Sequence, residues 1–312
     1  MKNKKKHFLV TGGTGFIGSA ICKLLLKKGY RVTIYDDNSR GKLNKIHVLK
    51  NKIKFIKGDI RNYKKLNKAF SNVDAVIHLA YVNGTKYFYT RPILILDIAV
   101  KGIINVIDIC KRRKIKELYL ASSSEVYQTP LKIPTTEKES LKIPDIYNPR
   151  YSYGGGKILT ELMGIHYGKK YFKKLIIFRP HNVYGPNMGG EHVIPEFIKR
   201  FKKLKNKNFK IQGTGKETRS FIHIDDFVNA FNLILNRGRH LNIYNIGTTE
   251  KIKIKDLALV MSQLFQKKIK LNKMPIQKGG TKIRIPNIDK IKKLGFKQKL
   301  KLKEGLRKLI NT

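Results

Sequence analysis

A tyrosine and a lysine stand four residues apart, at Tyr153 and Lys157, in a segment with helical character. Residues at this spacing share one face of a helix. An ammonium held near a phenol favours the phenolate and lowers its pKa from about 10, which a general acid–base tyrosine needs. With the hydroxyl of Ser123 upstream, the pair could remove a hydroxyl proton while a hydride leaves the same carbon for a nicotinamide. The spacing therefore predicts a site that oxidises and reduces an alcohol carbon.

Three glycines, Gly154, Gly155 and Gly156, separate the tyrosine from the lysine. Each costs about 1 kcal/mol relative to alanine in the interior of a helix. A sequence that breaks a local rule in this way often serves a site. Two simpler explanations stay open: helices contain such Tyr–Lys pairs by chance, and the helix could begin only at Lys157.

Ser123 belongs to a serine-rich segment, residues 122–127, that follows a strand-like run. Serines in such a place can simply cap or turn the chain, and they can also orient a substrate hydroxyl toward Tyr153. Glu125 lies in the same segment. Burial could raise the pKa of its carboxyl and make it a catalytic acid or base, whereas its simpler role is a salt bridge or a cap.

A glycine-rich turn runs from Thr11 to Gly18, with glycines spaced G-x-x-G-x-x-G. It follows a strand and opens a helix, so its backbone can approach a pyrophosphate that faces the unpaired amides of the helix start. Asp36 ends the next strand about 20 residues on, where an acid accepts hydrogen bonds from an adenosine ribose. A carboxylate there repels a 2′-phosphate and favours NAD over NADP, although Arg40 lies near enough to weaken that exclusion. The alternative is a glycine turn with a surface aspartate.

Two further strand ends carry polar groups to the same edge of the predicted sheet. Asp59 lies in the segment Gly58–Arg61, where it could bind an adenine amino group or simply form a turn. His78, Leu79 and Ala80 end the fourth strand, at the edge where ligands gather in sheets of this kind.

The elements that position these residues alternate along the first half of the chain. Strand-like runs cover residues 8–11, 32–35, 53–56, 75–79, 117–121 and 175–178, and helical segments cover 16–28, 62–70, 93–113 and 152–171. This alternation predicts an α/β fold with a doubly wound parallel sheet, a Rossmann domain, with helices on both faces.

The rhythm changes after Arg179, where prolines break the chain and shorter elements follow. We expect an NAD-binding Rossmann domain in residues 1–178 and a smaller α/β substrate-binding domain in residues 179–312. Residues 220–247 again show strand, helix and strand signals and are expected to return to the main sheet.

Composition narrows the class of protein. With 41% hydrophobic residues and no apolar run of about 20, the chain is expected to be globular and cytoplasmic, without a membrane span. The basic start runs at once into the glycine turn, which argues against a signal peptide. Cys22 and Cys110 are expected to be buried free thiols, and no metal site is predicted.

The formal charge of +46 is extreme. It comes from 67 lysines and arginines that are scattered along the chain rather than gathered in one arm. We interpret it as a general bias toward lysine and expect no nucleic-acid partner, although a non-catalytic Rossmann-type regulator or nucleic-acid binder remains an alternative. Such a binder would show steeply salt-dependent affinity and no turnover.

Several motifs in order resemble the extended short-chain dehydrogenases/reductases, the NAD-dependent nucleotide-sugar epimerase/dehydratase family. They are Thr11–Gly18, Gly58–Arg61, His78–Ala80, Ser122–Tyr127, Tyr153 with Lys157, Arg179–Pro186 and Arg219–Asp226. The resemblance covers essentially the whole chain. Two positions depart from the usual pattern, Ala99 in place of asparagine and Gln128 in place of glycine, and both would affect the sugar pocket.

The resemblance implies roles for individual residues. Ser123 would bind the sugar hydroxyl, Tyr153 would act as the base, and Lys157 would hold the nicotinamide ribose. On the substrate side, Asn182 would contact the sugar nucleotide, His192 would lie beside its base, and Arg219 and Arg284 would hold its diphosphate. The NAD-binding residues would be Gly12, Gly15, Phe16, Ile17, Gly18, Asp36, Asp59, Ile60, Leu79, Ala80, Tyr153 and Lys157. A homodimer through the two long helices, residues 93–113 and 152–171, is also implied.

For the reaction, we expect a 4-epimerase that forms a transient 4-ketosugar by hydride transfer to and from bound NAD. Simple 4-epimerases usually carry no acid at the position of Glu125, so a 4,6-dehydratase or a decarboxylase that uses Glu125 is the close alternative.

Overall fold

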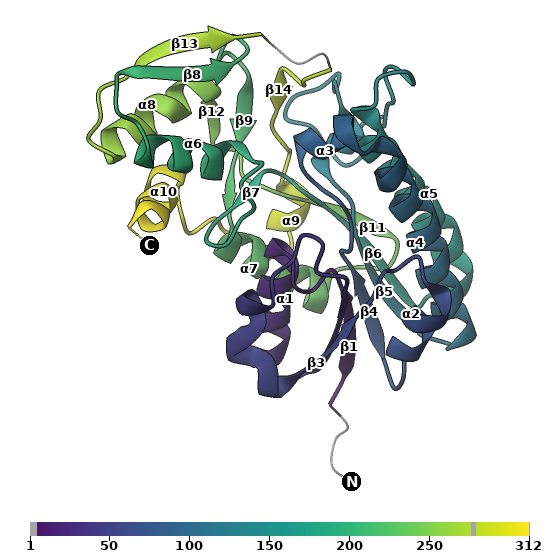
Figure 1. Cartoon of the computed structure of the whole chain (residues 1–312). Helices are drawn as coiled ribbons and strands as arrows, with labels where there is room; N and C mark the ends of the chain where they lie inside the picture. The colour runs from purple at the N-terminus through teal and green to yellow at the C-terminus, as the bar shows by residue number, and fades with distance from the viewer. Residues whose placement is uncertain (1–4, 276–278, 312) are drawn as a thin grey trace.

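The computed structural model describes residues 5–275 and 279–311. Its centre is a seven-stranded, fully parallel sheet in the order β11-β6-β5-β4-β1-β2-β3 (Figure 1). The strands are β1 (His7–Thr11), β2 (Arg31–Asp36), β3 (Ile53–Lys57), β4 (Ala75–His78), β5 (Glu117–Ala121), β6 (Lys174–Pro180) and β11 (Asn242–Ile246). The inner strands are mostly buried and rich in apolar residues because both faces of the sheet are covered.

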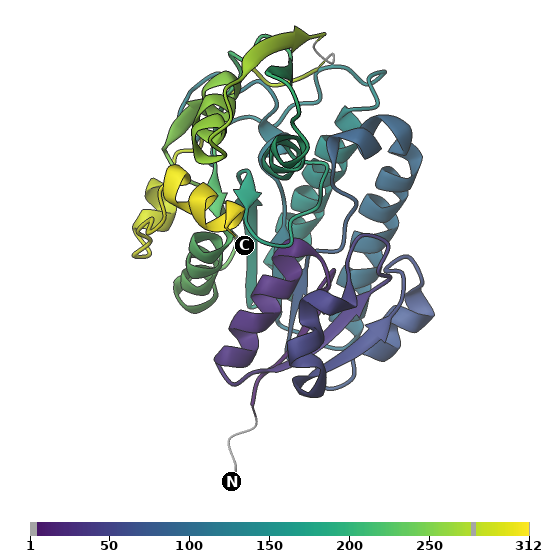
Figure 2. The ribbon, with the colours of Figure 1, turned by 60° about the vertical axis from the view of Figure 1, so that its left-hand side comes forward.

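Helices pack on both faces of this sheet (Figures 1 and 2). One face carries α1 (Phe16–Lys27) and α7 (Ile224–Arg237), and the other carries α2 (Tyr63–Ala69), α4 (Pro92–Arg112) and α5 (Tyr151–Tyr171). Each face has its own core. Phe227 and Phe231 of α7 pack in the first, and Ile103 and Val106 of α4 in the second.

A smaller part of the molecule lies beyond the carboxyl ends of the strands (Figure 1). It contains α6 (Val193–Lys202), β8 (Asn208–Gln212), β9 (Thr218–Ser220), β12 (Lys251–Lys253), α8 (Ile254–Leu264), β13 (Lys270–Met274), β14 (Ile283–Arg284) and α10 (Leu302–Ile310). Its core is separate and includes Phe197, Phe201, Phe209, Leu257 and Met261. We refer to it below as the smaller part.

The chain passes between the two parts more than once. After β6, the short strands β7 (Val183–Tyr184) and β10 (Ile222–His223) pair with each other at the joint. Helix α7 and strand β11 then return to the sheet, as residues 220–247 were expected to do. After β14, α9 (Asp289–Lys292) packs near β11 before α10 ends in the smaller part.

The six strands and four helices predicted for the first half are present, with ends shifted by no more than two residues. Three short elements were not predicted: η1 (Leu43–Lys52), α3 (Thr85–Thr90) and η2 (Ser124–Tyr127). Helix α5 already begins at Tyr151, so the alternative in which it begins at Lys157 is wrong and the three glycines lie inside it.

Both cysteines are buried free thiols, as expected. Within residues 5–275 and 279–311, no helix has the length and apolar character needed to span a membrane.

Candidate active site

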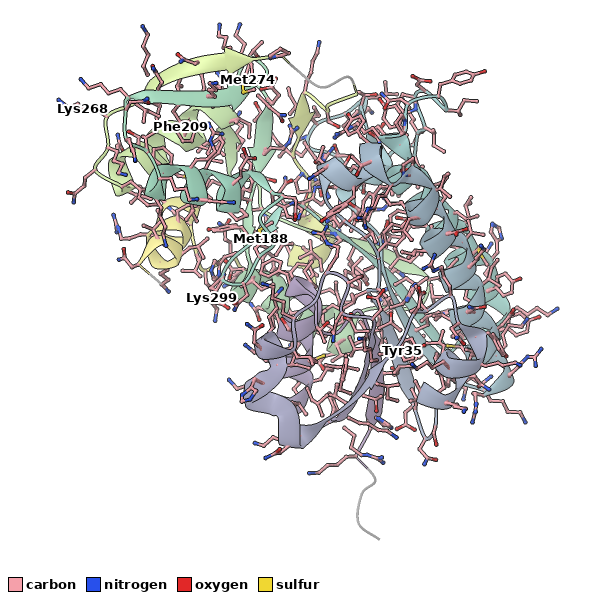
Figure 3. All side chains as sticks on the ribbon, in the orientation of Figure 1. Tyr35, Met188, Phe209, Lys268, Met274 and Lys299 are labelled. Carbon is pink, nitrogen blue, oxygen red and sulfur yellow. The ribbon has the colours of Figure 1, made fainter. Side chains whose placement is uncertain are left out.

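A cavity of about 920 Å³ lies between the sheet and the smaller part. Among the cavity-lining residues labelled in Figure 3, Tyr35 lies on the sheet side, Met188 near the joint and Met274 on the far side. The sequence-predicted residues that line this cavity are Gly12, Gly15, Phe16, Ile17, Gly18, Asp36, Asp59, Ile60, Leu79, Ala80, Ser123, Glu125, Tyr153, Lys157, Asn182, His192, Arg219 and Arg284. The fold therefore brings the predicted cofactor, catalytic and substrate residues to one place.

The glycine-rich turn has no room for side chains. Gly12 has a φ of +73°, and a Cβ there would lie 2.7 Å from the backbone nitrogen of Ala80. A Cβ on Gly18 would clash with the carbonyl oxygen of Gly12. Gly15 caps α1 without a side-chain hydrogen bond, so the first amides of that helix stay available to an anion.

Asp36 supports the turn from the end of β2. Its two carboxylate oxygens accept hydrogen bonds from the backbone nitrogens of Thr14 and Asn38, both at 2.9 Å. Each carboxylate oxygen has a further lone pair, so Asp36 can also accept from ribose hydroxyls. The bare glycine backbone, the open helix start and this acid together fit the diphosphate and ribose of NAD.

Ser123, Tyr153 and Lys157 meet where β5 ends against the first turns of α5. The Ser123 side chain hydrogen-bonds the phenol of Tyr153, and its oxygen also accepts from the backbone nitrogen of Glu125 at 3.2 Å. The Nζ of Lys157 donates to the carbonyl oxygen of Ala121 at 2.7 Å and lies 5.9 Å from the centre of the Tyr153 ring. The predicted set is therefore assembled, although the lysine does not bond the phenol.

The expectation that Lys157 lowers the pKa of Tyr153 is wrong for this structure. Burial and, to a smaller extent, the charge of Glu125 raise the pKa of the Tyr153 phenol above its ordinary value, while the bond from Ser123 and the charge of Arg284 act in the opposite direction. Burial also lowers the pKa of Lys157 to about 7, against the charge of Glu161. The loss of hydration is the largest effect on both pKa values because both side chains are almost fully enclosed by protein.

A buried ion pair joins β6 to α5 behind this set. The guanidinium of Arg179 donates to both carboxylate oxygens of Glu161, at 2.8 and 2.5 Å, and Ser122 donates to the same carboxylate. Glu161 lies four residues after Lys157, and Ser122 precedes Ser123. This network fixes the end of the strand that carries the serine to the helix that carries the lysine.

Glu125 is held between two arginines. Its Oε1 lies 2.7 Å from Nη1 of Arg284 and its Oε2 lies 3.7 Å from Nη2 of Arg150. Burial alone would raise the pKa of this carboxyl, but Arg284 and Arg150 outweigh burial and hold it at about 2. The hypothesis of a carboxyl with a raised pKa is therefore wrong, and the salt bridge that was the alternative is present.

Replacing Glu125 by glutamine should reduce the free energy of unfolding by about 2 kcal/mol at neutral pH, because two buried arginines lose their counter-ion. A carboxyl whose pKa is lowered by folding stabilises the protein above its unfolded pKa of about 4.3, and this stabilisation is lost as the pH falls toward 2. Urea unfolding at about pH 7 and about pH 3 should show the difference from the unchanged chain shrink by roughly half or more.

The matched control is Glu196→Gln, because Glu196 pairs with Arg200 on the exposed side of α6. It should cost less than about 1 kcal/mol at either pH. An equal loss at both pH values for Glu125→Gln would contradict the assignment of an ionised, paired Glu125.

The predicted substrate residues line the cavity on the side of the smaller part. Several of them also form contacts within the protein. Asn182 donates to the carbonyl oxygen of Ser220 at 2.8 Å, and His192 caps α6. Arg219 donates to backbone carbonyls, and burial with the nearby charge of Arg284 lowers its pKa to about 10. The Nε of Arg284 is buried and has no hydrogen-bond partner among the described residues. Two close guanidiniums, one with a donor to spare, favour an anion between them.

Arg40 contacts elements on both sides of the cavity. Its Nη2 lies 3.1 Å from a carboxylate oxygen of Glu191, and its guanidinium stacks 4.5 Å from the ring centre of Tyr87 in α3. The pairing with Glu191 partly neutralises the positive charge of Arg40, which the sequence suggested could bind a 2′-phosphate.

One of the two departures from the family pattern, Gln128, packs against Gly154. A Cβ on residue 154 would lie only 2.6 Å from the Nε2 of Gln128, so the glycine makes room for this side chain.

Sequence reasoning missed three residues of this site: Tyr81, Arg150 and Glu191, all of which line the cavity. Tyr81 was the residue with a usable signal, because it directly follows the strand end His78–Ala80 that was singled out. Arg150 and Glu191 lie in loops without a distinguishing pattern.

A seven-stranded parallel sheet with a glycine cradle and a Ser–Tyr–Lys set at its carboxyl edge defines a Rossmann-type, dinucleotide-binding protein. The model of the NAD dependent epimerase/dehydratase family matches residues 8–247, and the chain belongs to this family. The resemblance seen in the sequence is thereby confirmed, and NAD is the family's cofactor.

Curated relatives carry different activities. The chain is 35% identical to the dTDP-D-glucose 4,6-dehydratase of Dictyostelium discoideum over 83% of its own length and 63% of that relative, so it spans less than two thirds of that protein. It is 32% identical to a putative UDP-glucose 4-epimerase of Methanocaldococcus jannaschii over 97% of both chains. It is 30% identical to the UDP-N-acetyl-alpha-D-glucosaminuronate decarboxylase of Bacillus cytotoxicus over 98% of this chain and 97% of the other.

Solved structures agree on the fold. The UDP-glucose 4-epimerase of Thermotoga maritima, solved with UDP-glucose, is 26% identical, has a TM-score of 0.89 and covers 98% of this chain and 97% of its own. The Thermus thermophilus UDP-glucose 4-epimerase, solved in complex with NAD, is 24% identical with a TM-score of 0.83 and 98% coverage of both chains. The chain is thus a member of an enzyme family of NAD-dependent nucleotide-sugar epimerases, dehydratases and decarboxylases.

Proposed function

We propose that this protein is an NAD-dependent nucleotide-sugar 4-epimerase that works through a transient 4-ketosugar. The observation that carries the proposal is the combination of a complete Ser123, Tyr153 and Lys157 set with a Glu125 that is locked as a carboxylate. Such a site can move a proton and orient an alcohol carbon, and the carboxylate of Glu125 carries no proton to donate at neutral pH.

The roles within the site follow from the contacts. Ser123, bonded to the phenol of Tyr153, would hold the sugar hydroxyl against it. The Oη of Tyr153 would take the hydroxyl proton and later return it; Ser123 and Arg284 favour the phenolate, against burial and the charge of Glu125. NAD, when bound, supplies the acceptance and return of the hydride. Lys157 would hold the nicotinamide ribose, and Arg219 and Arg284 would hold the diphosphate of the substrate.

A 4,6-dehydratase is disfavoured by the state of Glu125. Loss of a sugar hydroxyl as water needs an acid that donates a proton to the leaving oxygen. A carboxyl with a pKa of about 2 carries no proton to donate at neutral pH. The proposal therefore ranks dehydration below epimerisation.

A decarboxylase is the second candidate, because one observation favours it. Arg284 and Arg150 place two guanidiniums around the carboxylate of Glu125, two residues after Ser123, and arginine forks bind carboxylates. Oxidation at C4 of a sugar with a C6 carboxylate gives a β-keto acid, which loses carbon dioxide without needing another acid. The decarboxylase among the relatives matches almost the whole chain.

Product mass distinguishes the three reactions. The purified chain should be incubated with UDP-, GDP-, dTDP- and CDP-linked sugars and uronic acids, and the products read by mass spectrometry and chromatography. A new stereoisomer of unchanged mass is the expected result. Loss of carbon dioxide would replace the proposal with a decarboxylase, and loss of water would replace it with a dehydratase.

We also propose a homodimer built on α4 and α5, which lie side by side at the outer edge of the molecule (Figure 1). This pair exposes large apolar side chains, Ile93 at 78% and Leu162 at 53%. Leu96 and Ile104 of α4 are also exposed, and apolar groups gathered on one pair of helices favour an interface. Analytical ultracentrifugation should show a dimer that Leu162→Glu converts to monomers, whereas Leu259→Glu on α8 should leave the dimer intact. A monomer before any substitution would refute the interface.

A further inference from the structure

The glycine just before Lys157 faces a tyrosine. A Cβ on Gly156 would clash with the hydroxyl of Tyr81 and would lie 2.6 Å from the Cβ of Ala99. Ala99 is itself buried in α4 and is one of the two positions that depart from the family's usual residue. Small residues on both long helices thus leave room for one large side chain, Tyr81, which follows β4.

The ring of Tyr81 covers the ammonium of Lys157. The Nζ of Lys157 lies 3.8 Å from the centre of that ring, the shorter of its two aromatic contacts. Tyr81 also meets the ring of Tyr153 edge-on, with centres 5.1 Å apart and an angle of 87° between the planes. An ammonium over the face of an aromatic ring is stabilised by the ring's quadrupole, and more strongly when water is excluded.

The hydroxyl of Tyr81 does not explain why the chain keeps a tyrosine here. It is buried and has no hydrogen-bond partner among the described residues. A buried hydroxyl without a partner costs stability. The useful part of the side chain is therefore the aromatic ring.

Few other groups stabilise the charge on Lys157. On its own helix it faces Tyr153 and the carboxylate of Glu161, whose charge Arg179 shares. From β5 it receives only the carbonyl oxygen of Ala121. From β4 it faces His78, a buried imidazole that burial and Lys157 keep neutral. Among the described residues, the face of the Tyr81 ring is its closest aromatic contact.

We propose that Tyr81 is a positioning residue that holds the charged Lys157 beside Tyr153 with the face of its ring. The proposal rests on the role of Lys157 in the proposed function and extends it to a residue outside the Ser–Tyr–Lys set. The missing side chain of Gly156 leaves room for the hydroxyl end of Tyr81.

The test measures the titration of Lys157 without any substrate. The full chain, as purified and with its NAD content recorded, is treated with a trace of acetic anhydride across a pH series. Mass spectrometry of the peptide that contains Lys157 then gives the pH midpoint at which the amine becomes reactive. In the unchanged chain this midpoint should lie near 7, set by the pKa of Lys157.

Tyr81→Leu should lower that midpoint by about one pH unit, because the pocket stays apolar while the ammonium loses the ring. Tyr81→Phe is the matched variant: it keeps the ring and removes only the unpartnered hydroxyl, so its midpoint should equal that of the unchanged chain. Thermal unfolding checks that both variants fold. If the leucine variant does not fold, Tyr81→Met, whose flexible side chain fills irregular space, replaces it with the same expected shift.

A midpoint in the folded leucine or methionine variant that equals or exceeds that of Tyr81→Phe would overturn the proposal. An equal downward shift in Tyr81→Phe would also overturn it, because the hydroxyl would then be the active part. Labelling needs no substrate, so its outcome is independent of which product the chain makes, and failure of the proposed reaction would be seen only in the product assay.

Discussion

Tyr153→Phe should lower turnover by about a thousandfold while leaving the fold unchanged. The phenol oxygen is the only atom removed, and it is the atom that Ser123 bonds. The phenyl ring should keep its stacking on Phe88, with ring centres 4.7 Å apart, and its edge contact with Tyr81. The measurement is the initial rate of product formation, with NAD affinity by calorimetry and thermal unfolding in parallel.

The matched control is Tyr171→Phe, at the far end of the same helix and outside the cavity. It removes the same oxygen from α5 and should leave the rate within about twofold. A Tyr153→Phe protein that turns over at the unchanged rate would show that another group moves the proton, and the catalytic assignment would fail.

Gly12→Ala should lower the affinity for NAD by at least about a hundredfold, or roughly 3 kcal/mol. The new Cβ would lie 2.7 Å from the nitrogen and 2.8 Å from the Cα of Ala80. Both are backbone atoms, so the clash cannot be relieved by a side-chain rotation, and the turn must move away from the position that admits a pyrophosphate.

Gly29→Ala separates this effect from backbone strain. Gly29 has a φ of +77°, close to the +73° of Gly12, but a Cβ there would meet nothing within 4 Å. Both variants should lose about 1 kcal/mol of stability from the left-handed backbone, Gly12→Ala should lose more because of its clash, and only Gly12→Ala should lose affinity for NAD. Calorimetric titration with NAD and urea unfolding of both variants measure the two quantities. Equal NAD affinity in the two variants would show that the turn does not hold the diphosphate.

The first half of the fold could be predicted because its signals are local. Strands such as β1 are short apolar runs, and helices such as α1 begin directly after a glycine turn. Helix α3 was missed because its six residues are too few to show a period, and η1 was missed because a 3₁₀ helix does not follow the 3.6-residue period of an α-helix. Helix α5 forms although three glycines oppose it, because it packs against the sheet and against α4. Its prediction from the sequence is therefore confirmed.

The predicted residues line one cavity, but their electrostatics were not predicted. Glu125 and Arg284 form an ion pair across 159 residues of sequence, and no spacing rule connects them. The pKa of Tyr153 depends on how completely the cavity wall encloses it, which only the packed structure determines. The predicted directions of the pKa shifts of Tyr153 and Glu125 were therefore wrong, although both residues line the same cavity. Tyr81 was overlooked because its contact with Lys157 depends on the space beside Gly156, a residue without a side chain.

The repeated passage of the chain between its two parts restricts how the protein can be re-engineered. Strand β11 forms one edge of the sheet and α7 covers one of its faces, although both come from the second half of the sequence. The chain then passes through the smaller part again before α9 packs against them. A chimera that takes a new sugar-recognition region from a homologue must therefore exchange two separate inserts, one before α7 and one after β11. A chimera joined once at residue 179 would combine six strands of this sheet with an edge strand, β11, from the homologue.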